Sequence, residues 1–167
     1  MQRSRKTMIT ALLVVALSGV GALIFLPSHE PKFDSFRKAH EAFNMGEFSD
    51  AAKLLEPLAQ SGDTRAARYV GIIEAFGLGR PINRNRAKKW IAMANEESSL
   101  AAGECSIGIH WANGHFGTQN VSEAAYWINY SDQLRGKKFC LNYFQGRRLP
   151  KELQSQIHEA ILELEAT

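Results

Sequence analysis

From residue 33 onward, apolar residues recur every three or four positions, which is the spacing of one face of an α-helix. No run of alternating apolar and polar residues is long enough to predict a strand. The pattern therefore predicts an all-helical domain. Its helix pairs lie at 34–44 and 49–61, at 64–76 and 83–94, and at 102–113 and 120–133, and terminal helices follow at 138–145 and 151–166.

Single residues predict where these helices pack and end. Ala39, Ala42 and Phe43 form an apolar stripe on the first helix, and the second carries one at Ala52, Leu55, Leu58 and Ala59. Ser49 and Asp50 are predicted to cap the second helix, and Asn83 the fourth. Gly71 inside a helix costs about 1 kcal/mol relative to alanine. We therefore expect the partner helix to approach it closely, near Trp90.

The chain also resembles itself at an offset of 37 residues, without a gap. Gly71, Gly77, Asn83, Ala87, Trp90 and Ile91 align with Gly108, Gly114, Asn120, Ala124, Trp127 and Ile128. A period of this size is typical of stacked helical hairpins. Trp90 and Trp127 are predicted to lie in the core between hairpins.

The segment Tyr69 to Gly79, followed by Asn83 and by Ala87 and Trp90, resembles a Sel-one-like repeat, a relative of the tetratricopeptide repeats. The marks are Gly77-x-Gly79 in the turn and Ala87-x-x-Trp90 in the second helix. A second copy has Gly108, Gly114, Ala124 and Trp127, but it departs from the pattern because Phe116 replaces the second turn glycine. The pair at 34–61 is more similar to a plain tetratricopeptide unit.

The resemblance covers residues 34–133 and implies a right-handed superhelix of about three helix-turn-helix repeats, with C-terminal capping helices. It further implies an adaptor in protein complexes, and bacterial members of the family are often exported and tied to envelope processes. Glycine-rich turns and Ala-x-x-Trp are marks of the fold, so they do not indicate a particular partner.

Residues 8–26 carry no charge and are long enough, at about 1.5 Å per residue, to cross a hydrocarbon core. Arg3, Arg5 and Lys6 precede them, so the positive-inside rule predicts a cytoplasmic N-terminus at 1–7. Length favours a single-pass signal-anchor over a cleaved signal peptide. We expect a linker at 27–32, the repeat domain at 33–135 and capping helices at 136–167, all exported, which in a Gram-negative bacterium means the periplasm.

Charge and cysteine content narrow the function further. The net charge of +3 comes from the N-terminus, because residues 33–167 hold sixteen cations and sixteen acids. Nucleic-acid binding is therefore not indicated. Cys105 and Cys140 are 35 residues apart, which is no metal-ligand spacing. They form one disulfide in an oxidising compartment or two buried thiols in a reducing one.

Two clusters are candidate partner-binding sites. Arg84, Arg86, Lys88 and Lys89 crowd the start of one helix, where cations are unfavourable, and they suggest a docking patch for an acidic partner or anionic lipid. The alternative is a solvated face paired with Glu96, Glu97 or neighbours. Trp111 and His115, with His110 and Phe116, form either an aromatic contact surface or ordinary packing between repeats. Their spacing from Cys105 and Glu104 does not support zinc.

The last helix, 151–166, has Leu153, Ile157, Ile161 and Leu164 on one face, which suits a terminal cap or a helix that docks on a partner. No phosphate loop, nucleophile elbow or catalytic carboxylate pair occurs, and Glu74 is interpreted as solvated. The sequence predicts a non-enzymatic, membrane-anchored scaffold for another envelope or secreted protein, without cofactor or small-molecule substrate. The alternative is a non-catalytic regulatory subunit of a cell-wall or polysaccharide enzyme.

Overall fold

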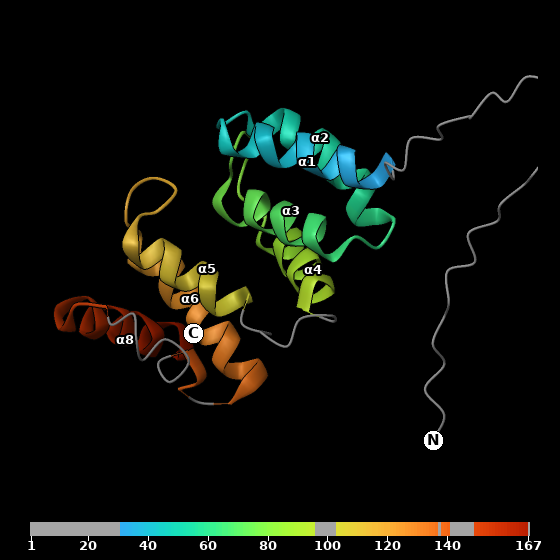
Figure 1. Cartoon of the computed structure of the whole chain (residues 1–167). Coiled ribbons are helices and arrows are strands. Elements are labelled where there is room, and N and C mark those ends of the chain that lie inside the picture. Colours follow the sequence, from blue (N-terminus) through green and yellow to red (C-terminus); the bar gives the residue numbers. More distant parts are fainter. Residues whose placement is uncertain (1–30, 96–102, 137, 141–148, 167) are drawn as a thin grey trace, which may run out of the picture.

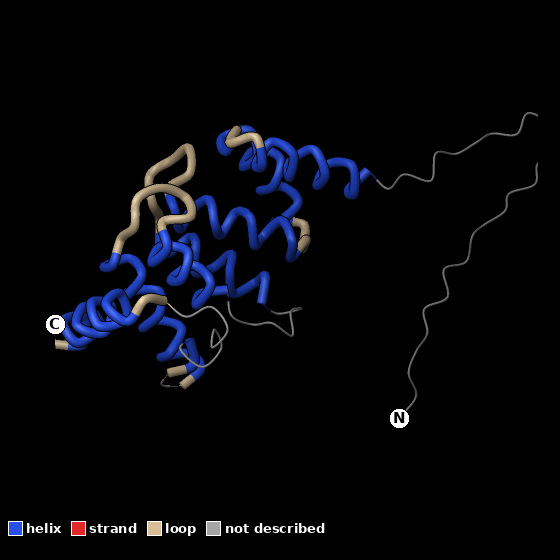
Figure 2. Tube along the Cα trace, turned by 60° about the vertical axis from the view of Figure 1, so that its left-hand side comes forward, coloured by secondary structure: helices blue, strands red, loops and turns tan. Residues whose placement is uncertain are grey.

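A computed structural model describes residues 31–95, 103–136, 138–140 and 149–166 of this chain. Within these ranges the structure is helical and contains no strand (Figures 1 and 2). The helices are α1 Pro31–Asn44, α2 Phe48–Gln60, α3 Thr64–Phe76, α4 Arg84–Asn95, α5 Gly103–Asn113, α6 Val121–Arg135 and α8 Lys151–Glu165. The predicted all-α fold and the three helix pairs are confirmed.

Consecutive helices pack as antiparallel neighbours, and α1–α2, α3–α4 and α5–α6 form three hairpins. Helix α2 packs on α3, and α8 packs on α6. The first hairpin therefore lies at one end of the array and α8 at the other (Figure 1). Helix α1 begins at Pro31, inside the predicted linker, and proline is well tolerated in a first helical turn because its missing N–H would be unpaired there.

The first hairpin buries the predicted stripes of both helices. Its capping prediction is wrong, because Glu47 occupies the N-cap of α2 and makes no side-chain capping bond. Ser49 lies one residue inside the helix, and its hydroxyl donates to the carbonyl of Gly79, 3.3 Å away. Ser49 thus links the start of α2 to the glycine-rich turn of the next hairpin.

In the second and third hairpins, the first helix ends at a glycine and the second helix begins after an asparagine, and the 37-residue offset aligns these residues. The side chains of Asn83 and Asn120 accept from the backbone N–H of Arg86 and Glu123, both at 3.0 Å. Gly77 closes α3 in the left-handed region at φ +64°, and Gly114 has φ +66° at the equivalent point after α5. The backbone therefore forms the same kind of turn again 37 residues later.

Gly71 and Gly108 mark the closest approach within each hairpin. A Cβ on Gly71 would lie 2.6 Å from Cδ1 of Ile91, and one on Gly108 would lie 2.7 Å from Cγ1 of Ile128. The expectation of close approach is confirmed, but the neighbour is Ile91 rather than Trp90. The reason is helical geometry, because Ala87, Ile91 and Ala94 share the face of α4 that is buried.

The two tryptophans differ although the repeat makes them equivalent. Trp127 is fully buried, as predicted. Trp90 is only half-buried and packs against the edge of the core, so its predicted core position is wrong. Ala87 and Ala124, the small residues three positions earlier, are both fully buried and allow close helix packing.

Among the residues that the structure describes, this arrangement forms two hydrophobic cores. The larger core runs through the first two hairpins and includes Ile107 and Trp127 of the third. The second core joins α5 and α6 to α8 through Ile109, Ile128 and Leu153, among others. Helix α8 buries Leu153 and Ile157 but leaves Leu164 42% exposed, so the predicted apolar face is buried only along its first half.

Two predicted elements fall largely or wholly beyond these ranges. Of the expected helix at 138–145, residues 141–145 lie outside the described residues, and so does the expected membrane segment at 8–26. Among the helices that the structure describes, none combines the length and apolar character needed to cross a bilayer.

Candidate functional site

The cation cluster at the start of α4 is used largely in contacts with neighbouring hairpins. Arg84 donates to both carboxylate oxygens of Glu123 on α6, at 2.8 and 3.2 Å. Its guanidinium also lies 4.2 Å from the ring centre of Tyr126. The hydrogen bond to Glu123 raises the pKa of Arg84, and burial opposes this effect. This contact ties the second hairpin to the third.

Arg86 makes the corresponding link toward the first half of the chain. Its guanidinium lies 3.0 Å from the carboxylate of Glu74 on α3 and 3.3 Å from that of Glu56 on α2. Arg80 reaches the same two carboxylates at 2.9 and 2.7 Å. Glu74 is 2% exposed, so its predicted solvated position is wrong. A buried carboxylate needs such partners to offset its lost hydration.

The two lysines of the cluster have different surroundings. The ammonium of Lys88 lies 3.9 Å from the ring centre of Tyr130, within the range of a cation–π contact. Lys89 is exposed. Three of the four cations therefore stabilise contacts between hairpins. The suggested pairing with Glu96 and Glu97 concerns residues outside the described ranges.

The residues around Trp111 belong to a continuous chain of aromatic contacts across the first helix of each hairpin. Phe43 of α1 lies 4.9 Å from Tyr69 of α3 between ring centres, and 6.3 Å from Phe116. Phe76 lies 4.8 Å from Phe116 and 4.7 Å from Trp111. We call the following six residues the aromatic strip: Phe36, Phe43, Tyr69, Phe76, Trp111 and Phe116.

Five of the six rings in the aromatic strip are half-buried, and only Phe76 belongs to the buried core. Such rings pack on the core from one side and keep an edge or face toward solvent. The two interpretations of the Trp111 cluster, packing and exposed surface, therefore both describe part of it. Large aromatic side chains in this position are favoured anchors for a partner protein.

The imidazoles of His110 and His115 lie at one end of the aromatic strip, with their Nδ1 atoms 2.8 Å apart. Glu104, the other group considered with them, instead binds Asn95 at 3.0 Å and Arg135 at 3.2 Å. In the described residues, no three His, Cys, Asp or Glu side chains are grouped so that they could hold a metal ion.

Cys105 and Cys140 are joined by a disulfide, with their Cα atoms 5.4 Å apart. The sequence left this pairing open. The bond links α5 to the stretch after α6, and both sulfurs lie in the second core beside Leu153 of α8. The connection thus fastens the end of the array to its third hairpin.

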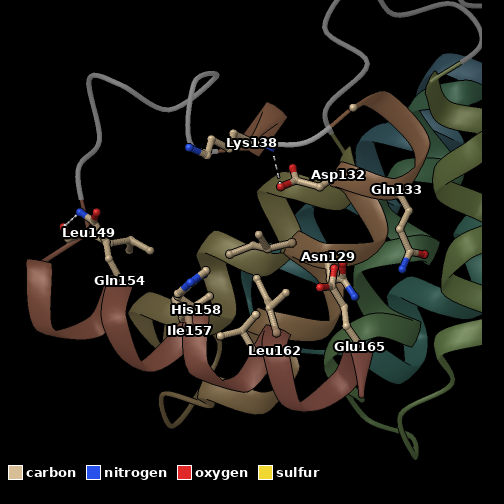
Figure 3. Close-up of a pocket in the computed structure, with 13 residues that line it drawn as sticks. Asn129, Asp132, Gln133, Lys138, Leu149, Gln154, Ile157, His158, Leu162 and Glu165 are labelled. Carbon is tan, nitrogen blue, oxygen red and sulfur yellow. Dashed lines mark hydrogen bonds between the residues drawn. The ribbon is translucent and has the colours of Figure 1, made fainter. Parts of the chain in front are cut away.

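A groove of about 570 Å³ opens between α6 and α8 (Figure 3). Its walls are apolar and come from Ile128, Leu149, Ile157, Ile161 and Leu162. Asn129, Gln133, His158 and Glu165 bring polar groups to its edge. Asp132 also lines the groove, but its carboxylate accepts from the backbone N–H of Lys138 and Cys140, both at 3.0 Å, so it fixes this turn.

Part of these surfaces follows from the sequence. The sequence predicts a contact cluster at Trp111, His115 and Phe116, but it does not predict Phe36 and Tyr69 as surface residues. Their signal was the spacing of Phe36, His40 and Phe43 on one helical face. The groove had no signal of its own, because it depends on the angle between two helices. No protein-family model, curated protein or solved structure that was compared with the chain matches it.

Proposed function

We propose that this protein is a membrane-anchored, exported scaffold whose aromatic strip holds a segment of another protein. The observation that carries the proposal is the row of half-buried rings on α1, α3 and the α5–α6 hairpin. Rigid aromatic groups lose little conformational entropy on binding, so they supply affinity efficiently. The chain performs no chemistry in this proposal and needs no cofactor.

The repeat geometry supports this interpretation. Gly71 with Ile91 and Gly108 with Ile128 make the same contact in successive hairpins. These contacts give successive hairpins the same internal packing, and stacked hairpins of one shape would build the right-handed superhelix expected of Sel-one-like repeats. Such a superhelix presents its first helices side by side as one binding surface.

Export is supported by three features. The uncharged stretch at 8–26 follows three cations, which favours insertion with the N-terminus in the cytoplasm. Few residues of the predicted linker at 27–32 separate this stretch from the first helix, which begins at Pro31. The disulfide between Cys105 and Cys140 is of the kind that persists in oxidising compartments.

Photocrosslinking in intact cells tests the partner-binding role. A photoreactive amino acid replaces Ile72, a half-buried residue three positions after Tyr69 on α3. The matched control replaces Lys53 on α2, whose side chain is 75% exposed. We expect a crosslinked protein from position 72 and none from position 53. Tyr69→Lys should abolish this product, whereas Arg68→Ala on the same helix should preserve it.

Equal products from both positions, or a product that persists in Tyr69→Lys, would contradict the proposal. A cell-wall or polysaccharide enzyme as the captured protein would instead assign the chain to the regulatory subunits.

Reporter fusions after Thr167 test export separately. Alkaline phosphatase should be active there and a fluorescent protein dark, and the reverse pattern would place the helices in the cytosol.

A further inference from the structure

Two imidazoles face each other where α5 turns toward α6. The Nδ1 atoms of His110 and His115 lie 2.8 Å apart, and their ring centres lie 4.7 Å apart with the ring planes at 78°. His110 is half-buried in the last turn of α5, whereas His115 lies in the loop and is exposed. At least one of the two rings is therefore open to solvent.

The preceding repeat shows that the turn does not need imidazoles at these positions. The 37-residue offset aligns His110 with Ile73, which is fully buried, and His115 with Leu78, which is 7% exposed. In the second hairpin the N–H of Leu78 donates to the carbonyl of Ile73 at 3.0 Å. In the third hairpin the N–H of His115 donates to the carbonyl of His110 at 3.1 Å. The backbone is thus repeated, and the greater exposure in the third hairpin explains polar side chains but not two imidazoles that face each other.

Surrounding contacts hold both rings in place. Between ring centres, His110 lies 6.4 Å from Phe76 of α3 and 5.6 Å from Phe116. Gly114 lies between the two histidines along the chain and has φ +66°, a conformation that glycine adopts readily. The backbone bond from His115 to His110 closes the turn. Side chains that are already positioned lose little conformational entropy on binding, so the pair is a preorganised site.

The separation of the two nitrogen atoms matches adjacent positions around one metal ion. Imidazole nitrogen binds first-row metals at about 2.0 Å, so two nitrogen atoms at a right angle on one ion lie about 2.8 Å apart. At the tetrahedral angle preferred by Zn²⁺ they would lie about 3.3 Å apart. Right angles occur in the square-planar and tetragonal sites of Cu²⁺ and Ni²⁺, and Cu²⁺ binds the more tightly of the two. A hydrogen bond between the rings has a similar length, so the ion would replace a shared proton.

We propose that His110 and His115 bind one Cu²⁺ ion through their Nδ1 atoms. Water would complete the coordination, because in the part of the chain that the structure describes no third His, Cys, Asp or Glu side chain is grouped with the pair. Structural metal sites use four protein ligands, so a site with two suits reversible binding. The ion would fix the turn that carries Phe116, the ring through which the third hairpin contacts Phe43 of α1.

Copper titration of the full chain tests the site. The chain is held in nanodiscs of zwitterionic lipid, and empty nanodiscs provide the background. The probe is Cu²⁺ alone, followed by electron paramagnetic resonance and by competition with a chelator. We expect one ion per chain, with an axial spectrum split by two nitrogen nuclei. Zn²⁺ should bind at least about tenfold more weakly.

Two variants, His110→Ile and His115→Leu, carry the residues that the preceding repeat has at these positions. Each should weaken Cu²⁺ binding by about tenfold or more, because loss of even an indirect partner of a metal ligand typically costs that much. His158→Ala, at an exposed histidine of α8, is the matched control and should not change binding. The helical circular dichroism of each variant is measured alongside. If His110→Ile loses helix content, His115→Leu decides, because its position is exposed.

Three results would overturn the proposal: no bound ion, Zn²⁺ binding as tight as that of Cu²⁺, or equal weakening by His158→Ala. A copper spectrum that both histidine variants leave unchanged would also overturn it, because the ion would then be bound elsewhere in the chain. The titration needs no partner protein. The scaffold proposal and this one therefore fail independently.

Discussion

Two glycines at the centres of α3 and α5 show how single residues set the spacing of helices here. A Cβ added to Gly71 would lie within 3 Å of the Ile91 side chain only. A Cβ added to Gly108 would also lie 3.1 Å from the carbonyl oxygen of Ala124 and 3.2 Å from the amide nitrogen of Ile128. A side chain can rotate to make room, but a helix backbone must shift as a unit. The two equivalent positions therefore differ in tolerance.

We expect Gly108→Ala to lower the free energy of unfolding by about 1–2 kcal/mol, because overpacking outweighs the gain in helix propensity. Gly71→Ala should cost less, since the Ile91 side chain can adjust. Urea unfolding followed by circular dichroism measures both values. Arg68→Ala, at an exposed position of α3, is the control and should change stability by less than about 0.5 kcal/mol. Equal costs for the two glycines would refute this ranking.

Asp63 provides a second residue-scale prediction, because it caps α3. Its carboxylate accepts from the amides of Arg65 and Ala66 and pairs with the Arg65 guanidinium at 2.8 Å. The side-chain hydrogen bond from Arg65 is the largest of the effects that hold the pKa of Asp63 below its usual value. A lowered pKa in the folded state means that this contribution to stability is present above the unfolded pKa. It is lost as pH falls below about 4.

Asp63→Ala should therefore cost about 1 kcal/mol at pH 7, as loss of an N-cap typically does. Asp63→Asn retains a capping oxygen, so it should cost less at pH 7. It should also remove the part of the acid sensitivity that Asp63 contributes. Thermal unfolding between pH 7 and pH 3 measures this difference. If the stability of Asp63→Asn depends on pH as that of the natural chain does, protonation of Asp63 has no effect on stability, which would contradict this prediction.

At the scale of elements, α4 is held from both sides by its arginines. Arg86 contacts acids on α2 and α3, and Arg84 contacts Glu123 on α6. Cations at a helix start oppose the helix dipole, so their position needs compensation. The carboxylates of the neighbouring helices supply it. The sequence showed the cluster, but the contacts explain why it lies there.

A double-mutant cycle on Arg84 and Glu123 should give a coupling of about 1 kcal/mol, because the pair is bidentate and Glu123 is nearly buried. Arg84→Ala alone should cost more than Lys89→Ala, since Lys89 is exposed. Chemical unfolding measures all four variants of the cycle. A coupling near zero would mean that the pair is no more than a solvated contact. Loss of the Arg84 side chain should change hairpin packing. Any partner-binding test of an Arg84 variant therefore needs this stability measurement as its control.

At the scale of the whole molecule, the disulfide fastens the third hairpin to the region that carries α8. It closes a span of 35 residues and lies in the core that α8 completes. A short array has few contacts to hold its last element, because each hairpin touches only its neighbours. The disulfide is therefore expected to stabilise the packing of α8 on the third hairpin.

Reduction should lower the free energy of unfolding by about 4 kcal/mol, the value that loop-closure entropy gives for a loop of this length. The melting temperature should then fall by roughly 10 °C. Calorimetry with and without reductant measures the shift, and the variant Cys105→Ser with Cys140→Ser should melt at the lower temperature under both conditions. If the melting temperature of the natural chain is the same with and without reductant, the disulfide does not contribute to its stability.

The sequence by itself determined the helices and their turns. Apolar spacing, Gly77 and Gly114 at helix ends, and Asn83 and Asn120 at helix starts are local signals, and local signals can be read without knowing what packs on them. The glycine at the close approach was also correctly predicted. All these features depend on backbone geometry within one hairpin.

Only the tertiary structure decided which residues meet between helices. It selected Ile91 rather than Trp90 as the partner of Gly71, buried Glu74 among arginines, joined Cys105 to Cys140, and placed six aromatic rings in one strip. The groove beside α8 arose in the same way. Such contacts depend on the rotation and angle between helices that are distant in sequence, and no pattern along one helix encodes that angle.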